Sequence, residues 1–222
     1  MDKLIFIIVG VGGIGGAVAR DLPKLISGTH HKMILIDGDI VEEKNTFRQP
    51  YQSQDIGINK ARALAKKINS FYDVKCLFED KYITNEELET LVSKYKEYTP
   101  VFVGCVDNDS TRQLIEKAYL TCETSFYIDG ANSEYDGNIY FSKIENKIKN
   151  GPLRSEVYQL QDDINPGLVG CEDHLAKGST QFFITNNKLA SIMLQLLDAI
   201  IKETDENVLG VTIVERFNTI HY

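Results

Sequence analysis

The chain is short of the residues and runs that mark secreted, membrane-bound or zinc-stabilised proteins. Its four cysteines lie far apart, and they form neither a Cys-x-x-Cys pair nor a Cys/His pair with the spacing of zinc ligands. No apolar run approaches the roughly 18 residues of a membrane-spanning helix. The first residues, Met-Asp-Lys before a strand-like run, are unlike a signal peptide. We therefore expect a cytoplasmic chain with free thiols, no structural zinc and no membrane partner.

Basic residues are also in the minority. The chain has 24 Lys and Arg against 32 Asp and Glu, a net charge of −8, whereas a dedicated nucleic-acid-binding protein usually presents a basic face. We therefore expect no nucleic-acid partner. The P-loop motif G-x-x-x-x-G-K-[ST] does not occur in the sequence. At 222 residues the chain is long enough to bury a sizeable core, and we expect a single domain over 1–222.

Strand-like and helix-like patterns alternate over the first 130 residues. Continuous apolar runs at 4–9 and 33–36 are typical of parallel strands covered on both faces. Pro23 lies inside the first helical pattern, at 13–26, and is expected to kink that helix or end it early. Further strands are expected at 74–78, 101–106 and 125–129, and further helices at 60–69, 85–95 and 110–120.

The pattern changes after Gly130. A strand is expected at 138–142, and 143–180 has no strong period, which predicts a long connection of the kind that is usually functional or disordered. A strongly amphipathic helix follows, and a terminal strand or hairpin is expected at 208–214 and 217–222. We interpret the apolar stripe of the helix as core, and also as part of a dimer interface if the stripe is wide. Its residues are Leu189, Ile192, Met193, Leu196, Leu197, Ile200 and Ile201.

The first strand-like run opens into a glycine-rich turn. Gly10, Gly12 and Gly15 match G-x-G-x-x-G between a strand and a helix, with Gly13 beside them. Such a turn lets the backbone approach a ligand and presents the unpaired N–H groups of a helix N-terminus to phosphate. Asp37 ends the second strand, 22 residues after Gly15, where a carboxylate can accept ribose hydroxyls. By itself the turn does not choose between NAD, FAD, S-adenosylmethionine and ATP.

These patterns together predict the fold class. We expect an α/β, Rossmann-like fold with a mostly parallel sheet, an antiparallel C-terminal half and helices on both faces. The nucleotide-binding half is expected at 1–130, and the mixed-sheet half, with its long crossover loop, at 131–222.

Polar side chains after the second and fourth strands narrow the choice of nucleotide. Arg48 and Lys60 can reach a triphosphate, and Asn45 can hydrogen-bond ribose or phosphate oxygens. Asp107 follows the fourth strand at the edge that faces the ligand crevice. Beside a triphosphate its natural partner is Mg²⁺, which one or two carboxylates bind together with phosphate oxygens. A redox enzyme of this fold needs no such cluster.

Several of these residues also have a purely structural interpretation. The two cations could be surface charges. Asp39 could order a loop, and Asp109 could cap the helix that begins beside it. His30 and His31 lie in a loop and are expected to be solvated.

Five motifs occur in a specific order. They are Gly10-x-Gly12-Gly13-x-Gly15, Asp37-x-Asp39-x-Val41, Asn45-x-x-Arg48-Gln49, Asp55-Ile-Gly57-x-x-Lys60-Ala61 and Asp107-Asn108 through Arg112. In this order they resemble the ThiF/MoeB/HesA family of adenylyltransferases, which are related to ubiquitin-activating enzymes. The resemblance is close over 4–142 and looser over 171–214. The fourth motif and the run Gln181-Phe-Phe-Ile-Thr-Asn186 look closest to a short ThiF-type branch encoded in some bacterial plasmid-borne clusters.

The resemblance implies an enzyme that binds ATP with Mg²⁺ and the C-terminal Gly-Gly of a small ubiquitin-like or sulfur-carrier protein. The terminal carboxylate attacks the α-phosphate and gives an acyl-adenylate and pyrophosphate. Arg48, Lys60 and Asp107 are the implied catalytic residues, and Asp107 would bind the metal. The implied nucleotide-binding residues are Gly10, Gly12, Gly13, Gly15, Asp37, Asp39, Asn45, Arg48, Gln49, Lys60, Asp107 and Asn108. A homodimer is usual in the family.

The chain departs from the family ahead of its first strand. Many relatives carry a helix there with Arg-Tyr-x-Arg-Gln, which lends an arginine to the active site of the partner subunit. An arginine finger can be worth on the order of a thousandfold in phosphoryl transfer. We expect that another residue compensates, that another chain supplies the arginine, or that the protein is a weak or altered catalyst.

Cys171 is a fourth catalytic candidate. It lies in Gly170-Cys171-Glu-Asp-His174, and relatives that form a thioester or persulfide place their cysteine in a comparable loop. A nearby imidazole or helix N-terminus activates a thiol. The alternative is an ordinary loop cysteine.

Three functions are therefore compatible with the sequence. The favoured one is adenylylation of a carrier protein. An NAD(P)-dependent oxidoreductase would use the glycine turn and Asp37 but would leave Arg48, Lys60 and Asp107 unexplained. A non-catalytic nucleotide-binding subunit of a complex is the third.

Overall fold

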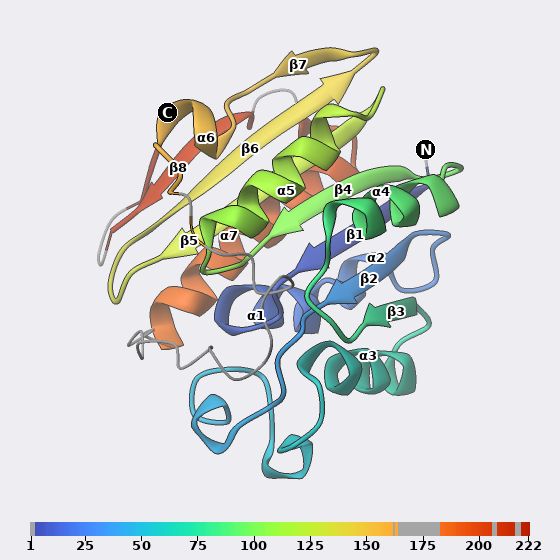
Figure 1. The fold of residues 1–222 in the computed structure, drawn as a ribbon, viewed down its shortest axis with the longest axis vertical. Helices are drawn as coiled ribbons and strands as arrows, with labels where there is room; N and C mark the ends of the chain where they lie inside the picture. The colour runs from blue at the N-terminus through green and yellow to red at the C-terminus, as the bar shows by residue number, and fades with distance from the viewer. Residues whose placement is uncertain (1–2, 162, 164–182, 206–207, 216–218) are drawn as a thin grey trace.

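A single sheet runs through the part of the chain that the computed structural model describes, residues 3–161, 163, 183–205, 208–215 and 219–222. Its strand order is β3-β2-β1-β4-β5-β6-β8-β9, and β7 pairs with the outer part of β6 (Figure 1). The strands are β1 (Leu4–Val9), β2 (Lys32–Ile36), β3 (Lys75–Glu79), β4 (Thr99–Gly104), β5 (Ser125–Asn132), β6 (Gly137–Glu145), β7 (Ile148–Asn150), β8 (Gly210–Val214) and β9 (Thr219–His221).

The sheet has the predicted parallel and antiparallel halves. Strands β3, β2, β1, β4 and β5 are parallel, and every pairing from β5 to β9 is antiparallel. The chain moves from β1 outward to β2 and β3 and then returns to the other side of β1 as β4. This reversal opens a crevice beyond the carboxyl ends of β1 and β4, which is where ligands bind in open α/β sheets.

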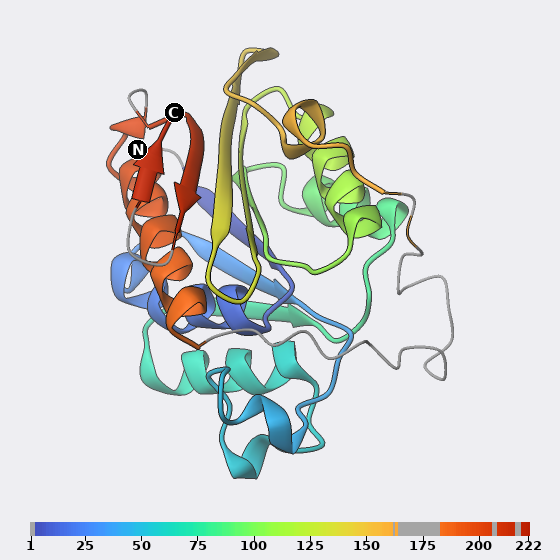
Figure 2. The same cartoon turned by 90° about the vertical axis from the view of Figure 1, so that its left-hand side faces the viewer.

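Helices cover both faces of the sheet (Figure 2). One layer holds α1 (Gly13–Asp21), α3 (Lys60–Phe71) and α7 (Phe183–Ile201), and the other holds α4 (Asn85–Lys94) and α5 (Asp109–Leu120). Pro23 ends the first helical pattern early, as predicted, and begins the short α2 (Pro23–Ile26). A membrane-spanning helix is not found among the residues that are described.

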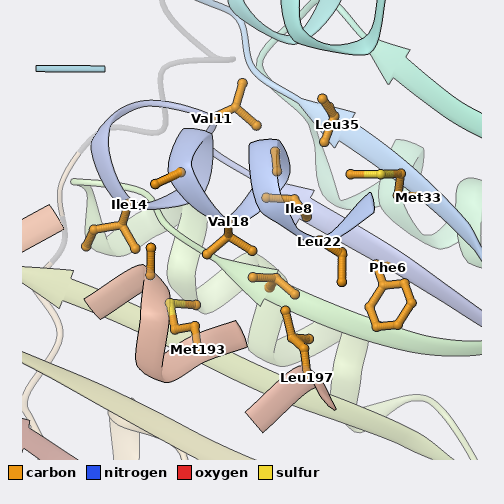
Figure 3. Packing of buried hydrophobic residues seen from close by; sticks show 14 of the residues in the cluster. Phe6, Ile8, Val11, Ile14, Val18, Leu22, Met33, Leu35, Met193 and Leu197 are labelled. Carbon is orange, nitrogen blue, oxygen red and sulfur yellow. The ribbon is translucent and has the colours of Figure 1, made fainter. Parts of the chain in front are cut away.

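Successive side chains of β1 point to opposite faces of the sheet, so they pack against both helix layers. Phe6 and Ile8 pack with α1 and α7, as Figure 3 shows, while Ile5 and Ile7 pack with α4 and α5. All six residues of β1 are buried, which is the pattern of a central parallel strand. The predicted apolar stripe of α7 is core: Met193 and Leu197 are fully buried against α1.

Two sequence-based expectations need correction. Residues 143–161 contain β7 and the short α6 (Arg154–Val157), so the connection is not irregular from its start. The hairpin turn between β6 and β7 uses Asn146 and Lys147 at positive φ, without the glycine that usually signals such a turn. His31 is buried rather than solvated, because its Nδ1 accepts the Leu4 N–H at 3.1 Å and its ring packs edge-on to Phe6.

Candidate functional site

The glycine turn joins β1 to α1 at the head of the crevice. Gly10 has φ +82°, and a Cβ there would lie 2.7 Å from the carbonyl oxygen of Cys105, just past β4. A Cβ on Gly15 would lie 1.9 Å from the Gly10 carbonyl oxygen. Both positions therefore require glycine for the turn itself. Gly13 begins α1, and a Cβ on Gly12 would meet only Gln49 Nε2, at 3.6 Å, which leaves room for a ligand.

Asp37 is fixed by two backbone donors at the end of β2. Its Oδ2 accepts the Val11 N–H of the glycine turn at 2.8 Å, and its Oδ1 accepts the Asp39 N–H at 2.9 Å. Burial raises the pKa of Asp37 to about 6, with Asp39 adding to the rise and the Lys60 ammonium opposing it. The structure therefore places a carboxyl group with a raised pKa in direct contact with the glycine turn.

Lys60 lies beside this carboxylate at the first residue of α3. It is only 7% exposed, and its Nζ forms an ion pair with Asp39 Oδ2 at 2.6 Å. Burial alone would lower the pKa of Lys60, but Asp37, Asp39 and, more weakly, Asp107 raise it above its ordinary value. Asp107 therefore acts on the same ammonium group from the end of β4.

The segment between β2 and α3 is a two-lobed excursion, seen below α3 in both ribbon views, that holds η1 (Glu43–Asn45) and η2 (Ser53–Asp55). Asn45 is buried within it, and its Oδ1 accepts the Glu42 N–H at 2.8 Å. Its carbonyl oxygen accepts the N–H groups of Gln49 and Arg48. In this structure Asn45 therefore orders the loop that carries Arg48, instead of presenting a free amide oxygen.

Gln49 faces the glycine turn from the excursion. Its Nε2 lies near Gly12, and its Oε1 is buried without a hydrogen-bond partner among the described residues. Pro50 packs closely on Gly16, so the excursion is held against α1. Arg48 precedes these two residues and is half-buried. A buried polar atom without a partner is costly in a native protein, which makes Gln49 a candidate contact for a bound ligand.

The end of β4 carries an exposed carboxylate next to a fully capped helix. Asp107 is exposed, and Asn108 is the N-cap of α5, accepting the Thr111 N–H at 2.9 Å. The expectation that Asp109 caps this helix was wrong, since it is the first helical residue. The described residues contain no group of three or more His, Cys, Asp or Glu side chains that could hold a metal ion.

A carboxylate also binds the first N–H groups of α5. Asp163 accepts the N–H groups of Asp109 and Ser110, each at 2.7 Å, and Asp109 Oδ2 in turn accepts the Gln161 N–H at 3.0 Å. These bonds hold Gln161 and Asp163 against the start of α5. Cys171, the proposed nucleophile, lies outside the described residues.

Three residues of the site carry no signal that the sequence analysis used. Tyr51 is buried and donates its hydroxyl to the Val11 carbonyl oxygen at 2.6 Å. Asn59 donates to the Asp37 and Asp39 carbonyl oxygens at 2.7 and 3.0 Å and also caps α3, so an N-cap search could have found it. Tyr82, between β3 and α4, donates its hydroxyl to Asp39 Oδ1.

A buried ion network lies on the α5 side of the sheet. Asp129 of β5 is completely buried and accepts from Nε of Arg154 in α6. Arg112 Nη1 lies 3.6 Å from the same carboxylate, and its Nη2 donates to the Val106 carbonyl oxygen. A Cβ on Gly104 would lie 2.5 Å from Asp129 Oδ1, so glycine is needed there. The network ties α6 to β5 and to the end of β4.

The structure thus brings together some of the predicted residues and not others. The glycine turn, Asp37 and Lys60 are neighbours, Gln49 faces Gly12, and Asp107 is close enough to act on Lys60. The side-chain oxygens of Asn45 and Asn108 bond backbone N–H groups, and Asp39 is the ion-pair partner of Lys60. The arrangement can receive a ribose at one carboxylate and phosphates at a helix N-terminus with a cation beside it.

Comparison with known proteins finds a matching family model and similar sequences. Residues 2–206 match the family model described as the ThiF family. The chain is 33% identical over 144 residues to ubiquitin-like modifier-activating enzyme 5 of Aedes aegypti, covering 60% of this chain and 36% of that protein. It is 28% identical over 165 residues to the Culex quinquefasciatus protein of the same name, covering 74% and 38%. The chain therefore spans less than half the length of these relatives.

Solved structures share the fold. Escherichia coli MccB in complex with MccA-N7isoASN has a TM-score of 0.72 at 16% identity, covering 99% of this chain and 64% of that chain. E. coli MccB with ATP has a TM-score of 0.67 at 18% identity, covering 99% and 63%. PaaA has a TM-score of 0.68 at 20% identity, again covering 99% and 63%. At these identities the similarity establishes the fold alone.

Proposed function

The chain belongs to the ThiF family, and we propose from this membership and from the site geometry that it is an ATP- and Mg²⁺-dependent adenylyltransferase. Its substrate is the C-terminal carboxylate of a small ubiquitin-like or sulfur-carrier protein. The relatives named for activating a ubiquitin-like modifier favour a protein acceptor, while the MccB structure with MccA leaves a peptide carboxylate as the alternative.

In the proposed reaction an oxygen of the acceptor carboxylate attacks the α-phosphorus of ATP. The bond from that phosphorus to the bridging oxygen breaks, and pyrophosphate leaves with the electron pair. Asp37 accepts hydrogen bonds from the ribose, and the N–H groups at the start of α1 face the phosphates. Lys60 and Arg48 stabilise the charge that develops on the phosphate oxygens. Catalysis of this kind rests on positioning and preorganised charge.

The residues at the crevice fit a nucleotide with its metal. Gly12 leaves space in front of the turn, and the buried Oε1 of Gln49 has no hydrogen-bond partner in the described part of the chain. Asp107 is exposed at the end of β4, where a carboxylate can hold Mg²⁺ together with phosphate oxygens. When bound, the ion would neutralise phosphate charge and polarise the phosphorus.

The position of Lys60 is the observation that carries the proposal. A nearly buried ammonium group lies beside two carboxylates at the carboxyl edge of the sheet, and a third carboxylate acts on it. A triphosphate accounts for such a preformed cation, whereas an NAD(P)-dependent oxidoreductase leaves it unexplained. We also propose that the enzyme acts as a homodimer.

Binding measurements separate the three candidate functions. We expect calorimetry to detect binding of α,β-methylene-ATP in the presence of Mg²⁺ and no binding of NADH. We expect Arg48→Met to weaken nucleotide binding, whereas Lys44→Met, a charge in the same excursion that pairs with exposed Glu42, leaves binding unchanged. Preferential binding of NADH would support the oxidoreductase. ATP binding with no release of pyrophosphate from ATP in the presence of any Gly-Gly-ended carrier tested would favour the non-catalytic subunit.

A further inference from the structure

Two contacts position Tyr82, one through its ring and one through its hydroxyl. A Cβ on Gly38 would lie 2.5 to 2.7 Å from three atoms of the Tyr82 ring, so the ring lies directly against the glycine backbone between Asp37 and Asp39. The hydroxyl donates to Asp39 Oδ1. Gly38 therefore admits an aromatic ring from the β3–α4 connection at the place where any other residue at 38 would project its own side chain.

Asp39 connects this tyrosine to the cation of the site. Its Oδ1 accepts from the Tyr82 hydroxyl, while its Oδ2 forms the 2.6 Å ion pair with Lys60 Nζ. Its carbonyl oxygen accepts the Lys60 N–H at 2.9 Å and an Asn59 side-chain N–H at 3.0 Å. The carboxylate itself is about half exposed, with 47% of the side chain accessible. An exposed aspartate has rotamer freedom that a second side-chain partner can remove.

We propose that Tyr82 is a positioning residue for Lys60: by fixing the Asp39 carboxylate, it sets where the ammonium group stands at the nucleotide crevice. The catalytic consequence rests on the proposed function, but the contacts that join Tyr82, Asp39 and Lys60 exist in the ligand-free chain. Lys60 must face phosphate oxygens in the proposed reaction, and a misplacement of about 1 Å can cost about a hundredfold in rate. A tyrosine 22 residues away in sequence thereby influences the phosphate-binding cation.

The ligand-free test measures the reactivity of the Lys60 amine. Limited acetylation with acetic anhydride, followed by mass spectrometry, compares Lys60 in the parent chain, in Tyr82→Phe and in Tyr98→Phe. Tyr82→Phe keeps the ring on Gly38 and removes only the hydroxyl. Tyr98 lies at the opposite end of the sheet, just before β4, with its ring over Lys32. We expect Lys60 to react several-fold faster in Tyr82→Phe, a change on the order of that for losing one charged hydrogen bond, and to be unchanged in Tyr98→Phe. Unchanged reactivity in Tyr82→Phe overturns the inference.

The second test is a double-mutant cycle on the affinity for Mg²⁺ with α,β-methylene-ATP. Tyr82→Phe should weaken binding by about tenfold, which corresponds to about 1.4 kcal/mol, and should have no further effect in a Lys60→Met background. Equal effects in both backgrounds would mean that Tyr82 acts on the nucleotide by another route and would overturn the inference. If the parent chain binds no nucleotide, the proposed function fails. The acetylation result still decides whether Tyr82 positions Lys60. Circular dichroism melts verify that each variant folds.

Discussion

The N–H of Val11 donates to Oδ2 of Asp37 at 2.8 Å, which joins the glycine turn to the end of β2. This bond occupies one lone pair of the carboxylate and orients its other lone pairs relative to the helix N-terminus. It places the group expected to bind ribose at a fixed position beside the N–H groups expected to bind phosphate. The same carboxylate has a pKa raised to about 6 by burial, so its charge changes within an accessible pH range.

We predict that nucleotide binding weakens below pH 6. The folded pKa of Asp37 is higher than its ordinary value, so the ribose-accepting carboxylate is lost as the pH falls through about 6. At a pH one unit below this pKa, the affinity for the nucleotide should be about tenfold lower if only the ionised form of Asp37 binds it. Calorimetry with Mg²⁺ and α,β-methylene-ATP between pH 5 and 8 measures this effect. Asp37→Asn should bind more weakly at pH 8 and lose this part of the pH dependence, and a variant with an unaltered profile would show that another group titrates.

We predict that Gly15→Ala disrupts the fold, whereas Gly12→Ala does so much less. The Cβ added at Gly15 would lie 1.9 Å from the Gly10 carbonyl oxygen and 2.8 Å from the Cys105 side chain, neither of which can move without opening the turn. Overpacking of this kind costs about 1–3 kcal/mol and occasionally more. The Cβ added at Gly12 would make an ordinary 3.6 Å contact with Gln49 Nε2. Urea unfolding compares the two variants, and equal losses of stability would contradict the turn geometry.

The sequence contains enough information to predict the elements and the location of the crevice. The burial of β1 on both faces follows from its continuous apolar run, and the glycine turn marks the switch point because only glycine fits at positions 10 and 15. The β6–β7 hairpin was missed because Asn146 and Lys147 adopt positive φ without glycine. Buried His31 was missed because its hydrogen bond is to a backbone 27 residues away.

The contacts within the site could be predicted only in part. Sequence motifs named Asp37, Lys60 and Asp107, which the structure brings within electrostatic range of one another. The motifs did not show that Asn45 and Asn108 would use their side-chain oxygens on neighbouring backbone N–H groups. Asn is a common capping residue, and local bonds of this kind compete with ligand contacts. The contact of Tyr82 with Asp39 spans 43 positions and has no local pattern to announce it.

We predict that His31 makes stability depend on pH. Burial, with a smaller contribution from His30, lowers the pKa of His31, and its Nδ1 must stay unprotonated to accept the Leu4 N–H. The folded state therefore binds fewer protons than the unfolded state. This contribution to stability is present above about pH 6.5 and declines as the pH falls through the folded pKa. Urea unfolding at pH 7.5 and 5.5 should show the loss. His31→Asn, which offers a non-titrating acceptor, should reduce the dependence, and His30→Asn should retain most of it.

We predict that Asp129→Asn is among the most destabilising single substitutions outside the glycine turn. Asp129 is completely buried, and the guanidinium groups of Arg154 and Arg112 both lie against its carboxylate. Removing its charge leaves the buried Arg154 without its carboxylate partner and Arg112 with Asp109 alone, at 3.7 Å. Breaking a buried ion pair from one side costs about 3–5 kcal/mol, which in a chain of this size lowers the melting temperature by about 10 °C.

Asp198→Asn provides the matched control for this substitution. Asp198 pairs with Lys202 at 2.6 Å on the surface of α7, with 33% and 64% of the two side chains exposed. An exposed i,i+4 pair contributes about 0.3–0.5 kcal/mol, so this variant should melt within a degree or two of the parent. Arg154→Met, which keeps the aliphatic stem and removes the charge, should lie between the two, because Arg112 still faces the carboxylate. Equal melting temperatures for the Asp129 and Asp198 variants would mean that the network adds nothing to stability, and α6 would then owe its position to Leu153 and the apolar contacts around it.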